Sequence, residues 1–188
     1  MLRRRFFRWI SAGVLPLFFP RFSRALPPGV TARETPLLLE IAAVVLPSSL
    51  GRTRCDEIAR QFAAWTQNYK PGADAGYGYG FPRPQVLPAN PADRYPDQLR
   101  QLEEIAASKG SSFQSLDRAR KREILIETLE TANIDKIPQR PNGKHIVADL
   151  LSFFYNSADG QDFLYNAAIK RDDCRGLATS AHRPAPLS

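Results

Sequence analysis

The chain has 188 residues, a formal net charge of +7 and 43% hydrophobic residues, which suits one domain with a sizeable core. Six of its 26 basic residues lie in residues 1–25, which contain no acidic residue, so the rest of the chain carries 20 basic and 19 acidic side chains. The basicity therefore belongs to the N-terminal segment, and the remainder offers no charge footprint for nucleic acid.

The first 25 residues have the pattern of an export signal. An arginine-rich start containing Arg3 and Arg4 is followed by Phe6, a short apolar run and small residues ending at Ala25, after which cleavage is expected. Paired arginines followed by phenylalanine resemble a twin-arginine signal, a route that carries folded proteins. An ordinary secretory signal or an uncleaved N-terminal anchor is the alternative.

Apolar residues spaced three and four apart predict a single all-α domain over residues 35–180. We expect five to six helices and one long loop rich in proline, glycine and tyrosine. Residues 26–34 are predicted to be a linker before the domain, and residues 181–188 a flexible tail after it. The predicted helices cover residues 37–46, 53–69, 97–108, 116–132, 144–155 and 161–169.

Several residues at the predicted helix ends have the chemistry of caps. Thr35 precedes a proline and is expected to cap the first helix, and Ser115 the fourth, while Gly110 is expected to end the third. Asp117 and Lys121 lie four residues apart on the charged face of the fourth helix, a spacing that favours a modest surface ion pair.

The long loop is predicted over residues 70–94. Its glycine–tyrosine alternation lacks the spacing of a phosphate-binding loop and follows no strand pattern. A loop of this length in a small domain is often functional or binds a partner. Because tyrosine and phenylalanine are enriched in interface cores, we expect Tyr77, Tyr79 and Phe81 to contact another protein.

The predicted helix over residues 144–155 is the strongest candidate for the core, because its apolar residues recur at helical spacing. Its opposite face carries His145, Asp149, Ser152 and Asn156. Ser152 lies about 10 Å along the axis from His145, so one straight helix cannot close a Ser-His-Asp triad. We expect this polar face to be solvated or to meet a partner.

Cys55 and Cys174 are the two cysteines of the chain, and export would place them in an oxidising compartment. Cys55 lies on the apolar side of its predicted helix, which favours burial. The two could bridge one another, stay free, or bridge to a partner chain. The sequence contains no Cys-x-x-Cys-His motif, which excludes c-type haem attachment by that route.

Taken in order, these features resemble the gluconate 2-dehydrogenase subunit 3 family, the small subunit of periplasmic sugar and sugar-acid dehydrogenases. The resemblance covers about residues 36–178 and is most specific in the last third. The pieces that carry it are the arginine-rich leader, Leu46-Pro47-Ser48-Ser49-Leu50-Gly51, Tyr77-Gly78, His145 with Phe153-Phe154-Tyr155, Tyr165-Asn166-Ala167-Ala168-Ile169 and Asp173-Cys174-Arg175-Gly176-Leu177.

The resemblance implies a non-catalytic subunit that assists the maturation and export of an enzyme. Its partners would be a flavin-containing catalytic subunit of the glucose–methanol–choline class, a multihaem cytochrome c and the twin-arginine translocase. FAD and c-type haem would belong to those partners, and this chain is expected to hold no cofactor and no metal. The complex would lie in the periplasm, associated with the cytoplasmic membrane, and Tyr165 and Arg175 would join the loop aromatics at the partner interface.

Two other functions stay open on the sequence. A stand-alone periplasmic enzyme or metal protein could use His145 as a base, with Asp149 within reach four residues on. These residues supply at most two protein ligands, whereas a catalytic zinc generally takes three. The other alternative is a helical adaptor unrelated to flavoenzymes.

Overall fold

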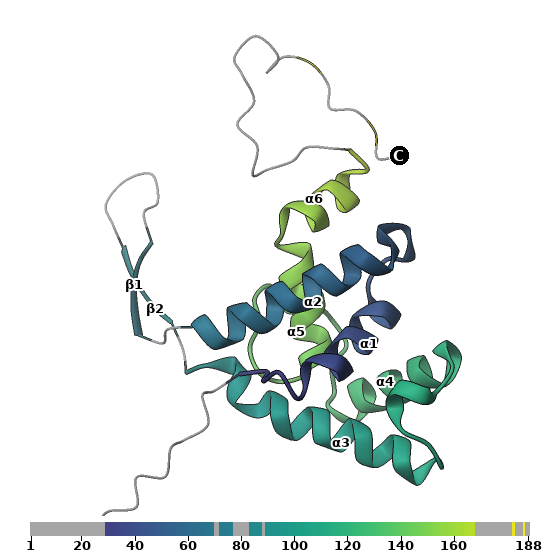
Figure 1. The fold of residues 1–188 in the computed structure, drawn as a ribbon. Helices are drawn as coiled ribbons and strands as arrows, with labels where there is room; N and C mark the ends of the chain where they lie inside the picture. Colours follow the sequence, from purple (N-terminus) through teal and green to yellow (C-terminus); the bar gives the residue numbers. More distant parts are fainter. Residues whose placement is uncertain are drawn as a thin grey trace, which may run out of the picture.

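The computed structural model describes residues 29–69, 72–76, 83–87 and 89–167, together with His182 and Pro186 (Figure 1). The all-α class is confirmed, because the domain is built from helices packed around one core. Its α-helices are α1 (Thr35–Val45), α2 (Gly51–Asn68), α3 (Tyr95–Ser108), α4 (Arg118–Thr131), α5 (Ile146–Tyr155) and α6 (Ala158–Tyr165). Short 3₁₀ helices are η1 (Ser48–Leu50), η2 (Pro91–Arg94) and η3 (Phe113–Ser115).

The core lies where α5 meets α1, α2, α3 and α4. As predicted, the apolar face of α5 is buried, and Ile146, Leu150 and Phe154 have no exposed surface. Each such side chain contributes roughly 1.5–3 kcal/mol when fully buried. Phe62 of α2 connects this face to α3, because its ring centroid lies 5.7 Å from that of Tyr95 and 5.5 Å from that of Phe153.

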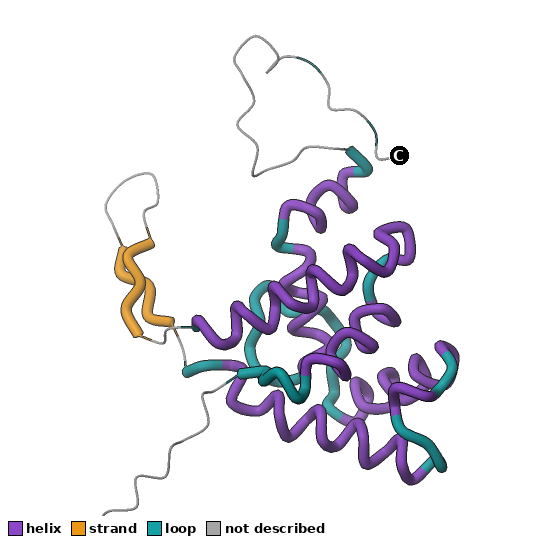
Figure 2. Tube along the Cα trace, in the orientation of Figure 1, coloured by secondary structure: helices purple, strands orange, loops and turns teal. Residues whose placement is uncertain are grey.

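The prediction that residues 70–94 form an irregular loop is wrong in part. Strands β1 (Gly72–Gly76) and β2 (Arg83–Leu87) pair antiparallel in this stretch, and η2 follows them. Figure 2 shows the two strands standing beside the helices rather than among them. The pairing was missed because β1 consists of glycine, alanine and aspartate, which are depleted in strands. Residues 77–82, with Tyr77, Tyr79 and Phe81, lie outside the described residues.

Two helix starts differ from the prediction. Thr35 lies inside α1, and the turn before it is closed by the Glu34 carboxylate, which accepts hydrogen bonds from the Thr31 backbone N–H (2.7 Å) and hydroxyl (2.8 Å). Helix α4 is capped by Asp117, whose carboxylate accepts from the Arg120 N–H at 2.8 Å. Ser115 instead ends η3. Asp117 wins because its extended backbone points its carboxylate at the free N–H groups of the first turn.

The last residues of the predicted linker are packed against α2. Val30 is fully buried; its N–H donates to the Thr66 hydroxyl (3.1 Å) and its carbonyl accepts from the Gln67 side chain (2.6 Å). Gly29 has a φ of +127°, and a Cβ there would lie 2.9 Å from Thr66 Oγ1. In the described structure, ordered packing therefore begins ahead of α1, at about residue 29.

Several predicted features lie outside the described residues. These are the export signal with Arg3, Arg4, Phe6 and Ala25, and the segment with Cys174 and Arg175. Among the helices that are described, none is individually long and apolar enough to cross a membrane. Thr35–Val45 and Ser48–Asn68 reach that length and composition only as a pair bent by 112°.

Candidate functional site

The polar face of α5 is buried, which corrects the prediction that it is solvated or meets a partner. Asp149 is 0% exposed, Ser152 1% and His145 6%. The reason is that the segment before α5 folds back over this face. Its Gln139 carbonyl accepts a 2.9 Å hydrogen bond from the Asn156 side chain at the far end of the helix.

Asp149 lies at the centre of this buried cluster. Its carboxylate accepts hydrogen bonds from the Tyr95 hydroxyl (2.7 Å) and from the backbone N–H groups of Asn142 (3.0 Å) and Gly143 (2.7 Å). Burial raises the pKa of Asp149, and the three donors act against that rise. Burial, together with the neighbouring Asp149 charge, holds the pKa of Tyr95 far above its usual range, so Tyr95 stays a donor.

Two residues let the segment before α5 approach α3 and η2. Gly143 has a φ of +77°, and a Cβ there would lie 2.7 Å from the Pro91 carbonyl oxygen. Gln98 of α3 donates to the carbonyls of Gly143 and Lys144, at 3.1 Å each, and accepts from the Ile146 N–H at 2.7 Å. Gln98 therefore satisfies part of the first turn of α5 from another helix.

His145 is the N-cap of α5, with Nδ1 accepting from the Val147 N–H at 3.2 Å. Burial lowers the pKa of His145 from 6.5 to about 4, so the ring is neutral at pH 7 and carries its proton on Nε2. The expected contact between His145 and Asp149 is not formed, since Asp149 bonds Tyr95 and the two amides instead. Searching the described ranges finds no group of three or more His, Cys, Asp or Glu side chains placed to hold a metal ion.

Ser152 completes the buried polar face. Its hydroxyl is the one buried side-chain oxygen for which the described part of the chain supplies no hydrogen-bond partner. Ser152 does not approach His145 as a nucleophile would, so the rejection of a triad on this helix agrees with the geometry.

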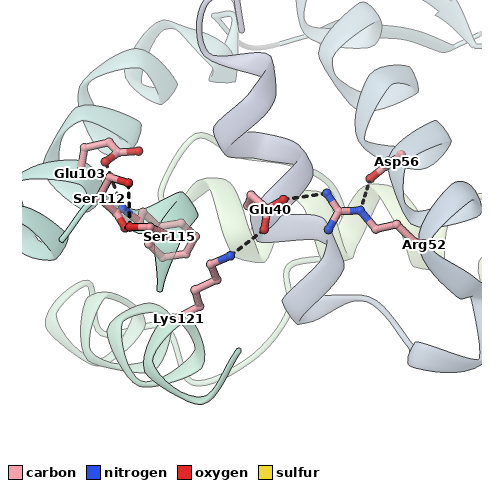
Figure 3. A network of polar contacts seen from close by, with 8 residues as sticks. Glu40, Arg52, Asp56, Glu103, Ser112, Ser115 and Lys121 are labelled. Carbon is pink, nitrogen blue, oxygen red and sulfur yellow. Dashed lines mark hydrogen bonds and ion pairs between the residues drawn. The ribbon is translucent and has the colours of Figure 1, made fainter. Parts of the chain in front are cut away.

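A second cluster joins α1, α2 and α4 (Figure 3). The Glu40 carboxylate lies 2.6 Å from Lys121 Nζ and 2.7 Å from an Arg52 guanidinium nitrogen, and Arg52 also contacts Asp56 at 2.9 Å. The predicted surface pair of Asp117 with Lys121 is therefore wrong. Lys121 is buried because α4 turns it toward α1. The hydrogen bond from Lys121, followed by that from Arg52, lowers the pKa of Glu40.

Cys55 lies beside this second cluster. It is buried, as predicted, and burial raises the pKa of its thiol. It lines a pocket of about 360 Å³ with side chains that include Glu40 and Arg52. Its pairing with Cys174 stays a prediction, because Cys174 lies outside the described residues.

The end of α6 exposes three consecutive bulky side chains. Phe163 is 36% exposed, Leu164 57% and Tyr165 67%. The start of the helix is fixed by Ser157, which accepts from the Gly160 N–H, and by an ion pair between Asp159 and Arg54 of α2. Tyr165, predicted to contact a partner, is thus held on an anchored helix with most of its surface accessible.

The described residues define a small all-α domain with a buried carboxylate cluster and an exposed aromatic helix end. Comparison of the chain with family models, with curated proteins and with solved structures finds no match.

Proposed function

We propose that this chain is the non-catalytic small subunit of a periplasmic, membrane-associated flavoprotein dehydrogenase similar to gluconate 2-dehydrogenase. In this proposal it assists the maturation of the catalytic subunit and lends it a twin-arginine address. A multihaem cytochrome c completes the complex, and FAD and haem belong to the partner subunits.

The observation that carries the proposal is the exposed end of α6. Phe163, Leu164 and Tyr165 form a bulky apolar surface on a helix whose other end is anchored to α2. Contiguous exposed apolar side chains mark interaction sites, and aromatic residues are enriched at interface cores. Tyr165 also opens one of the sequence pieces that resemble the subunit 3 family.

The geometry of α5 weighs against the stand-alone enzyme. That alternative needs His145 and Asp149 to act together as a base or as metal ligands. Asp149 instead accepts three hydrogen bonds that hold the segment before α5 on α3, and Nδ1 of His145 caps the helix. Both side chains therefore have structural roles that catalysis would disturb.

The test is co-expression of this chain with the flavoprotein encoded beside its gene, followed by affinity purification. The wild-type chain should bring down the flavoprotein, detected by flavin absorbance. Leu164→Asp with Tyr165→Ser should reduce the recovered flavin about tenfold or more, since such exposed aromatic and aliphatic anchors dominate binding energy. Ile137→Asp changes an equally exposed apolar residue away from α6 and is the matched control.

Each outcome decides something different. Failure of the wild-type chain to retain the flavoprotein contradicts the proposed function. Retention by both variants keeps the function and removes α6 from the interface. Purification with a partner that binds no flavin supports the adaptor alternative.

A further inference from the structure

A groove of about 530 Å³ runs between α3 and α4 and is closed at one end by the residues that begin α5. Its walls include Gln98, Gln101 and Thr128, and its closed end is formed by Lys144 and His145. This groove lies on the other side of His145 from the Asp149 cluster in bonding terms, because none of the hydrogen bonds to Asp149 involves a groove-lining residue.

His145 presents an unused donor to this groove. Nδ1 accepts from the Val147 N–H, so the neutral ring carries its hydrogen on Nε2. No acceptor for that hydrogen lies among the residues that the structure describes, although the side chain is more than nine-tenths buried. A buried N–H without an acceptor is costly, and a ligand in the groove could supply the acceptor.

The groove also carries two uncompensated positive charges. Lys144 precedes His145, and Arg94 lies one helical turn before Gln98, the residue that grips the backbone of residues 143–146. Within the described ranges neither Arg94 nor Lys144 forms an ion pair.

The two acidic residues in the groove wall are already neutralised. Asp97 lies 2.7 Å from an Arg100 guanidinium nitrogen, and Glu127 lies 2.7 Å from Lys109 Nζ. The local field at the closed end therefore favours an anion.

We propose that the closed end of this groove binds a carboxylate group, which accepts a hydrogen bond from His145 Nε2 between the charges of Lys144 and Arg94. A phosphate fits less well, because phosphate sites at helix starts use free backbone N–H groups. Here the Ile146 N–H is bonded to Gln98 and the Val147 N–H to His145. The inference goes beyond the proposed function and applies to the chain by itself.

The experiment uses the two imidazole rings of the chain, His145 and His182, as paired reporters in NMR spectra of the purified chain. Acetate, succinate, inorganic phosphate and chloride are titrated at constant ionic strength and pH 7. The His145 ring signals should shift and saturate with the carboxylates, while those of His182 stay in place. Equal shifts in chloride, or saturation with phosphate and not with carboxylates, would overturn the proposal.

Variants assign the binding to these residues. Lys144→Ala and Arg94→Ala should each weaken carboxylate binding about two- to fivefold, the range of a solvent-exposed charge contact. Lys136→Ala removes an exposed cation outside the groove and should change nothing. His145→Asn keeps a capping oxygen but lacks the Nε2 donor, so the shift of the Lys144 amide should no longer saturate. Wild-type affinity in Lys144→Ala and Arg94→Ala together would overturn the site.

A capped tripeptide, Ala-Glu-Ala, distinguishes two sources of the carboxylate. Saturation by succinate assigns the groove to a small organic acid, and saturation by the peptide alone assigns it to an acidic side chain of a protein. Either result supports a carboxylate site, and binding of neither overturns it.

Discussion

The Tyr95 hydroxyl donates a 2.7 Å hydrogen bond to the Asp149 carboxylate across 54 residues of sequence, with both side chains fully buried. This contact joins the first residue of α3 to the middle of α5. The same carboxylate holds the backbone of Asn142 and Gly143, so a single side chain fixes three segments.

Tyr95→Phe should therefore lower the free energy of unfolding by about 1.5–3 kcal/mol, the usual contribution of a hydrogen bond to a charged group. Denaturant titration measures this change. Ser152→Ala is the matched control, because its buried hydroxyl has no partner in the described structure and its loss should be neutral or stabilising. A Tyr95→Phe variant as stable as the wild type would contradict the role assigned to this bond.

Gly143→Ala should destabilise the domain by about 2 kcal/mol or more. The φ of +77° strains any side chain, and the added Cβ would lie 2.7 Å from the Pro91 carbonyl oxygen. Gly110→Ala separates the two effects, since Gly110 has a φ of +93° with open space around it. Its loss should be about 1 kcal/mol. Equal losses in thermal or denaturant unfolding would show that the contact with Pro91 has no energetic consequence.

Protonation of His145 should destabilise the fold in mild acid. Its pKa is 6.5 when unperturbed and about 4 in the folded chain, so the unfolded state binds the proton first as pH falls. Stability from this group is complete above pH 6.5 and is lost as pH falls toward 4, by about 3 kcal/mol in total.

Asp149 acts in the opposite direction. Its pKa is raised from 3.8, so the folded state holds the proton more tightly, and its contribution falls as pH rises above 3.8. Comparing the wild type with His145→Asn between pH 4 and 7 isolates the histidine contribution. An unchanged pH profile in the variant would show that His145 does not titrate in this range.

Lys121→Met should test the buried pair with Glu40. Glu40 keeps Arg52 as a partner, so we expect a loss of about 1–3 kcal/mol rather than unfolding. Arg120→Met on the same helix removes an exposed pair with Glu123 and should change stability by less than about 0.5 kcal/mol. Indistinguishable unfolding curves for the two variants would contradict the structural role of Lys121.

The sequence predicted the apolar faces well because they follow local periodicity. The core face of α5, the burial of Cys55 and the end of α3 near Gly110 depend on residues close in the chain. The polar face of α5 could not be predicted in this way, because the groups that satisfy Asp149 come from Tyr95 and from a backbone segment folded over the helix. Adjacent Asn142 and Gly143 did indicate the turn there.

Lys121 shows the same limit. A lysine on a charged helix normally faces solvent, and only the approach of Glu40 from α1, 81 residues away, makes its burial favourable. The β1–β2 hairpin was missed for a different reason, since its strands lack the composition that signals strands. The placement of Gln98 across the start of α5 left no local signal.

The most direct test of the proposed function is the cellular location of the flavoprotein partner when Arg3→Lys and Arg4→Lys are combined in this chain. With the wild-type leader, dehydrogenase activity and flavin should be found in the periplasmic and membrane fractions. With the double variant, the flavoprotein should accumulate in the cytoplasm, because this chain would carry the only export address of the pair. Normal periplasmic activity in the double variant would contradict the account.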